Sequence, residues 1–184
     1  MSGFRYRVAA FAVALATAVA TGSTPGFADP VELGPVTLRG DGPSYLDLGA
    51  GVYDLVGNAH RNETGAVEAE LRYGRKFLNI GPAAGVIADF RGGGMAYVGI
   101  YSDFAWGPIV VTPLGGFGAW WHGSSNDEYL GGTFEFRLQV QASYEFDNAS
   151  RLGLRVGHIS NANTHQRNPG DNDVMLTYGM PFNL

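Results

Sequence analysis

The sequence lacks cysteine, which excludes disulfide bonds and thiol chemistry. It is also short of positive charge, with 12 lysine and arginine residues against 17 aspartate and glutamate residues. An acidic chain without a basic stripe argues against nucleic acid as a partner. These two shortages therefore point away from redox-active thiols and from nucleic-acid binding.

Long hydrophobic runs are absent as well, apart from one near the N-terminus. Two arginines precede an apolar run over residues 8–20, and small residues follow as far as Ala28. This is the order of regions in a secretory signal peptide, and the run is short for a membrane-spanning helix. We expect a signal peptide over residues 1–28 and a mature domain over residues 29–184. Export without disulfides suits a protein of the bacterial envelope.

No later stretch is long and apolar enough to span a membrane as a helix. A mature domain that crosses a membrane would then have to be a β-barrel, because only helices and closed barrels satisfy every backbone group in lipid. The 28 glycines and the aromatic content of 12% suit a β protein with close backbone approaches and aromatic belts.

Alternation of apolar and polar residues is the dominant pattern in the rest of the chain. The clearest example covers residues 134–146, where apolar and polar positions alternate without interruption. This length suits a tilted membrane strand. Eight such runs of about ten residues are present, over residues 44–55, 64–74, 79–89, 95–105, 109–121, 131–146, 150–160 and 173–182.

A soluble, lipocalin-like barrel also alternates, with its apolar side chains inside. Two features favour the opposite arrangement. Aromatic residues gather near the ends of the apolar faces, as in interfacial girdles. The polar faces carry both signs of charge, which predicts an interior ion-pair network of Glu68, Glu70, Arg72, Glu135, Arg137, Glu145 and Arg155. The predicted fold is all-β: an eight-stranded antiparallel transmembrane β-barrel of the bacterial outer membrane, filled by side chains.

The connections between the runs predict the orientation of this barrel. Three connections are short, at residues 75–78, 106–108 and 147–149, and three others are longer, at residues 56–63, 122–130 and 161–172. Outer-membrane barrels usually have short periplasmic turns and long external loops. The run over residues 150–160 therefore ends at the outer surface.

His158 and Ser160 stand at that outer end, two residues apart. Because side chains in a strand repeat every second residue, both share a face with Leu152, Leu154 and Val156. Their Cβ atoms would be roughly 6–7 Å apart, within reach of a base and its nucleophile. Asn161 and the turn after it offer N–H groups for an oxyanion. The alternative is an interfacial histidine beside turn-forming residues.

The stretch from His158 to Ala162, followed by Asn168-Pro169-Gly170, resembles the PagL family of lipid A 3-O-deacylases. The resemblance extends back through residues 131–134 and 144–153. Members of this family are eight-stranded outer-membrane barrels with a Ser-His-Glu triad on their outer surface. The resemblance implies that Ser160 is the nucleophile and His158 the general base. It implies that Asn161 and Asn168 serve the oxyanion or order the loop. We expect no cofactor, and no ligand spacing in the sequence supports a metal site.

The acid of the triad is where this sequence departs from the family. The family has glutamate in a Gly-x-Glu position, and the matching residue here is Asn172. Asn172 has the parity of the lipid-facing residues that follow it, whereas Asp173 has the opposite parity and Asp171 lies toward the loop. We predict that Asn172 orients His158, with Asp173 as the substitute if a bulge turns it outward.

These patterns predict an outer-membrane serine esterase that removes an ester-linked acyl chain from lipid A of lipopolysaccharide in the outer leaflet. The first alternative is a non-catalytic structural or adhesive barrel, which the missing glutamate supports. The second is a soluble barrel that binds an apolar ligand, which the polar inner faces oppose. The acyl position that is cleaved and the choice between monomer and homodimer stay open at this point.

Overall fold

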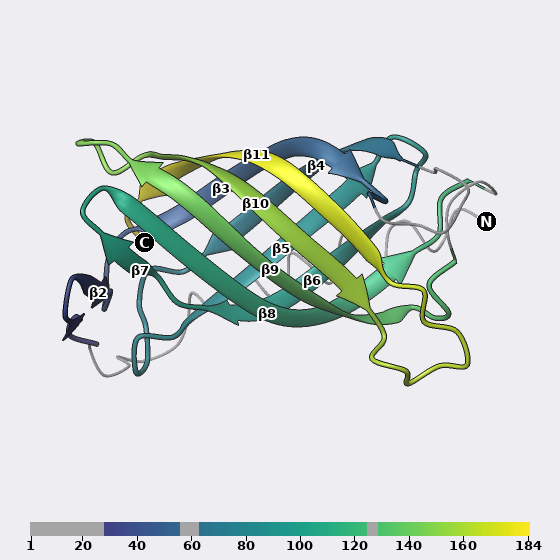
Figure 1. The fold of residues 1–184 in the computed structure, drawn as a ribbon, viewed down its shortest axis with the longest axis horizontal. Coiled ribbons are helices and arrows are strands. Elements are labelled where there is room, and N and C mark those ends of the chain that lie inside the picture. The colour runs from purple at the N-terminus through teal and green to yellow at the C-terminus, as the bar shows by residue number, and fades with distance from the viewer. Residues whose placement is uncertain (1–27, 56–62, 125–128) are drawn as a thin grey trace.

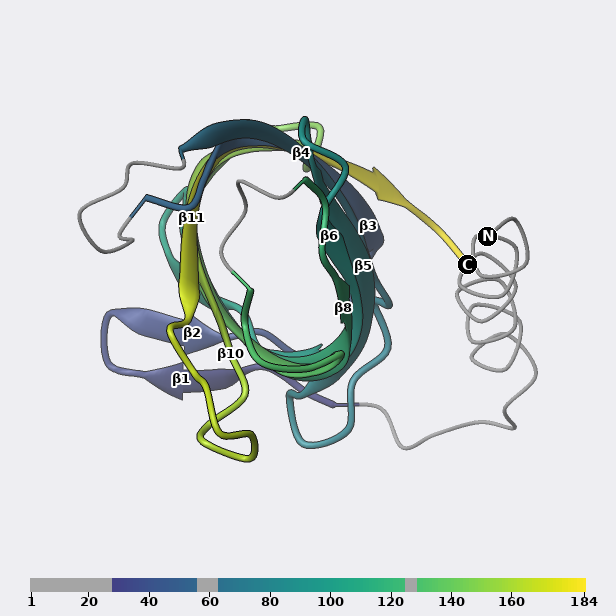
Figure 2. The same ribbon diagram turned by 90° about the vertical axis from the view of Figure 1, so that its right-hand side faces the viewer.

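Eight long antiparallel strands form a closed barrel in the computed structural model, which describes residues 28–55, 63–124 and 129–184 (Figures 1 and 2). These strands are β3 (Ser44–Tyr53), β4 (Thr64–Arg72), β5 (Gly81–Asp89), β6 (Gly94–Tyr101), β8 (Ile109–Trp121), β9 (Phe134–Glu145), β10 (Arg151–Ser160) and β11 (Asp171–Phe182). Pairing of β3 with β11 and of β8 with β9 closes the ring. The predicted fold class is confirmed. In the described part of the chain, no helix has the length and apolar character to cross a membrane.

Three short strands lie outside the ring. β1 (Val31–Leu33) and β2 (Val36–Leu38) form a hairpin, and β2 pairs with β7 (Phe104–Trp106) at the end of the barrel where β3 begins (Figure 1). They are too short to show a period in the sequence. The run predicted over residues 95–105 corresponds to parts of two strands, because β6 ends at Tyr101 and β7 begins at Phe104. The signal peptide stays a prediction, since residues 1–27 lie outside the described residues.

Alternation along the strands separates an apolar outer surface from a polar interior. On β9, Leu138 and Val140 are 59% and 44% exposed, whereas Arg137, Gln139 and Gln141 between and beside them are at most 3% exposed. This is the inverse of a soluble barrel, and it confirms the predicted direction of the faces. A polar interior must pair its charges, because an unpaired buried charge is costly.

The interior contains a continuous network of ion pairs. Arg155 lies 2.8 Å from Glu68 and 3.1 Å from Glu70, and Arg72 lies 2.7 Å from Glu70. The Tyr97 hydroxyl bridges both glutamates at 2.5 Å. The buried arginine, glutamate and tyrosine side chains of this network occupy the middle of the barrel interior. Desolvation of these charges offsets much of their mutual attraction, so the network is weak evidence for stability.

Two of the residues predicted for this network behave differently. Glu145 lies at the end of β9 and pairs with Arg39 and Arg151, away from the central cluster. Glu135 is fully buried, but among the described residues neither of its carboxyl oxygens has a hydrogen-bond partner. The prediction of an ion pair for Glu135 is therefore wrong. Parity places a residue inside a barrel, but its partner depends on which strands face it across the interior.

Candidate active site at the outer end of strand β10

Strand β10 leads an apolar stripe up to a pair of polar side chains. Leu152, Leu154 and Val156 are exposed on the outer surface, and His158 and Ser160 continue the same face half-exposed. The loop after β10 projects from the end of the barrel opposite the β1–β2 hairpin (Figure 1). The two side chains thus stand where the apolar belt gives way to the outer loops.

His158 has one defined partner. It is paired directly with Asn172 across the β10–β11 ladder, and its Nδ1 lies 2.9 Å from Asn172 Oδ1. With the amide oxygen as acceptor, Nδ1 carries the proton and Nε2 keeps a lone pair. This is the tautomer that a general base needs toward a hydroxyl.

The two aspartates beside Asn172 point into the barrel. The register is regular to the start of β11, with Ile159 opposite Asp171, so no bulge turns a neighbour outward. Asp173 is buried and forms a bidentate ion pair with Arg137 on β9. Asp171 is 4% exposed. The geometry therefore places neither carboxylate beside His158, and the substitution of Asp173 for the family's acid has no support in it.

Ser160 shares the outer face with His158, but the two are not hydrogen-bonded in the part of the chain that the structure describes. Gly170, at φ +71°, packs against the imidazole, and a Cβ there would lie 2.9 Å from His158 Cε1. The loop backbone thus fixes one side of the ring. Catalytic hydrogen bonds are often open in a protein without substrate and tighten when substrate binds.

The asparagines of the loop hold its backbone. The Asn161 side chain is buried, and its Nδ2 donates to the carbonyls of Leu130 and Arg167, each at 2.7 Å. The Asn161 N–H donates to Asn168 Oδ1 at 3.0 Å. Of the two roles predicted for Asn161 and Asn168, this geometry favours ordering of the loop over direct contact with an oxyanion.

A tight turn follows Asn161. Ala162 and Asn163 both have positive φ, at 51° and 63°, and Thr164 donates its N–H to the carbonyl of Asn161 at 3.0 Å. The N–H groups of Ala162 and Asn163 lie in this turn, directly after Ser160 and Asn161 in the sequence.

An aromatic cluster beside Ser160 was not recognised in the sequence. Phe136 lies directly opposite Ser160 on β9, its ring centroid is 5.2 Å from that of Phe134, and Phe134 lies 5.9 Å from Phe117. Leu138 is opposite His158. The alternation in β9 contained these residues, but the sequence did not show which of them would flank the serine. Their apolar surface continues from the site toward β8.

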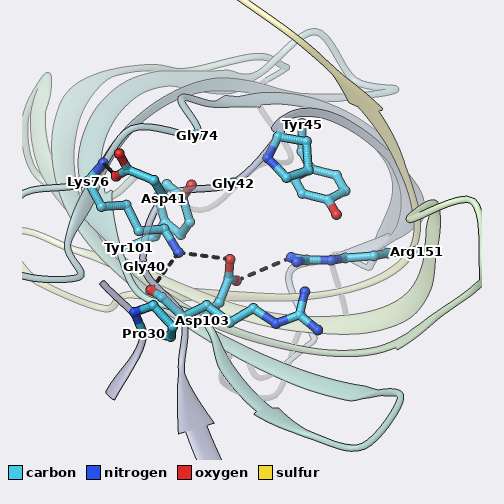
Figure 3. A pocket seen from close by; sticks show the side chains of 12 residues that line it. Pro30, Gly40, Asp41, Gly42, Tyr45, Gly74, Lys76, Tyr101, Asp103 and Arg151 are labelled. Atoms are coloured by element: carbon cyan, nitrogen blue, oxygen red, sulfur yellow. Dashed lines mark hydrogen bonds and ion pairs between the residues drawn. The ribbon is translucent and has the colours of Figure 1, made fainter. Parts of the chain in front are cut away.

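A cavity of about 190 Å³ lies at the opposite end of the barrel from Ser160, beneath the N-terminal segment (Figure 3). Its charges are paired: Asp103 lies 3.2 Å from both Lys76 and Arg151. Although burial works in the other direction, Arg151 and Lys76 hold the pKa of Asp103 well below its usual range. Burial lowers the pKa of Lys76. The charged side chains of this cavity are thus paired with one another and have a structural role. The candidate site is therefore the surface around Ser160 at the other end of the barrel.

Comparison with known proteins identifies relatives of this arrangement. The family model "Lipid A 3-O-deacylase (PagL)" matches residues 17–181. Lipid A deacylase PagL of Bordetella bronchiseptica is 36% identical over 56 residues, which are 30% of this chain and 32% of that protein. The aligned segment thus spans about a third of the length of this relative.

Two solved structures share the fold. The outer membrane enzyme PagL superimposes with a TM-score of 0.56 at 21% identity, over 75% of this chain and 99% of that one. A designed transmembrane β-barrel superimposes with a TM-score of 0.53 at 13% identity, over 79% of this chain and 99% of the design. At these identities the likeness concerns the fold alone.

Proposed function

The chain belongs to the lipid A 3-O-deacylase (PagL) family, and from this membership we propose that it is an outer-membrane ester hydrolase that removes an acyl chain from lipid A. Lipid A of lipopolysaccharide in the outer leaflet is its substrate, and the family's name points to the ester at position 3. The proposed site lies entirely within one chain, so the chemistry requires no second copy.

One observation supports this function above the others: the hydrogen bond from His158 to Asn172 on an outward, lipid-facing surface, with Ser160 on the same face. A histidine held in the Nδ1–H tautomer next to a serine is the arrangement of an activated nucleophile. A soluble enzyme would place it in a cleft. Here the apolar stripe below it and the outer loops above it match an ester at the boundary between acyl chains and head group.

In the proposed reaction, Ser160 Oγ attacks the ester carbonyl and His158 Nε2 accepts the hydroxyl proton. The tetrahedral intermediate collapses when His158 returns that proton to the leaving sugar oxygen, which leaves an acyl-serine. Water then attacks the acyl-serine, with His158 again as base, and releases a free carboxylic acid. The N–H groups of Ala162 and Asn163 are the proposed donors to the oxyanion.

Asn172 takes the place of the family's glutamate in this scheme. Its amide oxygen holds the Nδ1–H tautomer and orients the ring, as the asparagine does in Cys-His-Asn sites. A neutral amide stabilises the imidazolium less than a carboxylate does. The proposed enzyme is therefore slower than one with glutamate at this position.

Purified protein in detergent micelles with lipopolysaccharide tests the proposal. Release of a free fatty acid by the wild type, and its loss in Ser160→Ala and in His158→Asn with the barrel still folded, would support it. A folded wild type that releases no acid from any lipid A would favour the non-catalytic barrel, for which the absence of glutamate at residue 172 is the specific observation.

A further inference from the structure

Two buried polar side chains behind the site carry oxygens without a hydrogen-bond partner among the described residues. Glu135, near the outer end of β9, is fully buried, and within the described residues neither Oε1 nor Oε2 accepts a hydrogen bond. Asn161, directly after β10, is also fully buried, and its Oδ1 has no donor there either. Orphaned acceptors inside a protein are costly and call for an explanation.

The register brings these two residues together. The β9–β10 pairing ends with Arg137 opposite Ile159 and Phe136 opposite Ser160. Glu135 and Asn161 are the next residues beyond this last pair, one on each segment. Both have the parity of the barrel interior. The side chain of Asn161 lies close to the Glu135 carboxyl.

Among the described residues, Glu135 takes part in none of the ion pairs that the arginines of the barrel interior form. Arg137, the next inward residue of β9, is bound to Asp173 of β11 and to Gln139, and lies 3.6 Å from Glu68 of β4. On the other side of β9, the residue opposite Glu135 on β8 is Gly118.

Two further acidic residues, Asp171 on β11 and Asp54 directly after β3, are buried at this end of the barrel, and His165 lies against Gly132 in the loop region. Asp171 on β11 interacts with the hydroxyl of Tyr53 on β3, which also interacts with Trp120 on β8. Among the described residues, a carboxylate at Glu135 would thus be buried without an ion pair or a donor, and such a group takes up a proton instead.

We propose that Glu135 is a neutral carboxylic acid whose O–H donates to Asn161 Oδ1, and that this hydrogen bond positions the active-site loop. One proton removes the charge of Glu135 and gives Asn161 Oδ1 a donor. It also fixes the Asn161 amide so that Nδ2 faces the carbonyls of Leu130 and Arg167. Glu135 is then a positioning residue that acts through Asn161 on the turn after Ser160, a role that rests on the proposed function.

Ionisation of Glu135 would reverse this arrangement. A carboxylate has no proton to donate, so the negatively charged Glu135 and the Asn161 Oδ1 would repel each other. As the pH rises and Glu135 loses its proton, the hydrogen bond to Asn161 Oδ1 is lost. The loop is then less well positioned, and the rate of ester cleavage falls. Glutamine at this position keeps an N–H donor for Asn161 Oδ1 and does not titrate.

Infrared spectroscopy of the full-length barrel in micelles tests the protonation directly, without any substrate. The wild type at neutral pH should show the C=O stretching band of a protonated carboxyl that disappears in Glu135→Gln. Glu145→Gln is the matched control, because Glu145 is paired with Arg39 and Arg151 and should contribute no such band. A spectrum in which Glu135→Gln removes no protonated-carboxyl band overturns the proposal, whether or not the protein proves to be an esterase.

The pH profile of ester cleavage tests the positioning role. Wild-type activity should fall on the alkaline side, and Glu135→Gln should keep the neutral activity and abolish that fall. Glu135→Ala should be about three- to tenfold less active at neutral pH, as expected for one lost hydrogen bond. An alkaline limb that is unchanged in Glu135→Gln contradicts the proposal even if Glu135→Ala fails to fold.

Discussion

His158 Nδ1 lies 2.9 Å from Asn172 Oδ1, and the two residues are direct partners in the β10–β11 ladder. The contact follows from the register alone, since opposite residues on one face of an antiparallel pair are the closest side-chain neighbours. A site built in this way depends on the strands more than on the loops.

Replacing Asn172 with acidic and apolar residues tests its orienting role. Asn172→Glu should raise kcat severalfold, because a carboxylate stabilises the imidazolium that forms during attack. Asn172→Leu should lower kcat by at least about tenfold, because the tautomer is no longer held. Initial rates at saturating lipopolysaccharide in micelles measure both. Equal rates in wild type and Asn172→Leu would remove Asn172 from the mechanism.

Asp173→Asn should affect folding more than chemistry. Asp173 lies inside the barrel against Arg137, and loss of one charge of a buried pair typically costs about 3–5 kcal/mol. The expected result is a lower urea midpoint of unfolding with the rate per folded molecule little changed. If the folded variant is inactive while Asn172→Ala is active, Asp173 is the acid and the register argument fails.

Gly170→Ala should disturb His158 without disturbing the barrel. Gly170 has a positive φ, and an added Cβ would lie 2.9 Å from His158 Cε1, so the imidazole must move. Displacement of a catalytic group by about 1 Å can reduce the rate about 100-fold. The rate of ester cleavage should therefore fall strongly in Gly170→Ala, whereas the thermal unfolding curve should change little. Gly92→Ala is the control, because Gly92 also has positive φ but has open space around it. Equal effects of the two substitutions on the rate would contradict contact with the imidazole as the cause.

Leu154→Arg tests the lipid-facing surface. Leu154 is 58% exposed in the middle of β10, and arginine on the lipid face near the bilayer midplane costs about 2–4 kcal/mol. Folding into lipid vesicles, followed by urea titration, should show this loss, and Leu154→Met should not. An unchanged midpoint for Leu154→Arg would mean that this face meets water.

The sequence predicted what depends on the two-residue period. The outward face of Leu138 and the shared face of His158 and Asn172 follow from parity once the strands are located. The sequence alone could not show how far the alternation in each strand continues. Asn161 lies one residue past the end of β10 and keeps the inward parity, so its amide orders the loop from inside.

Contacts between side chains across the barrel interior could not be predicted from the sequence, for a different reason. They depend on the stagger between strands, which no single strand reveals. The pairing of Asp173 with Arg137 and the isolation of Glu135 are both of this kind. The short strands β1 and β2 were missed because three residues cannot display a period.

The mass of lipid A from bacteria that produce this protein is the most direct test of the central claim. Lipid A would be compared in cells with the wild-type protein, with an equal amount of folded Ser160→Ala, and with no protein. The account predicts a species that has lost one ester-linked acyl chain in the wild type alone. Identical lipid A in all three, or the same loss in Ser160→Ala as in the wild type, would contradict a serine esterase at this site.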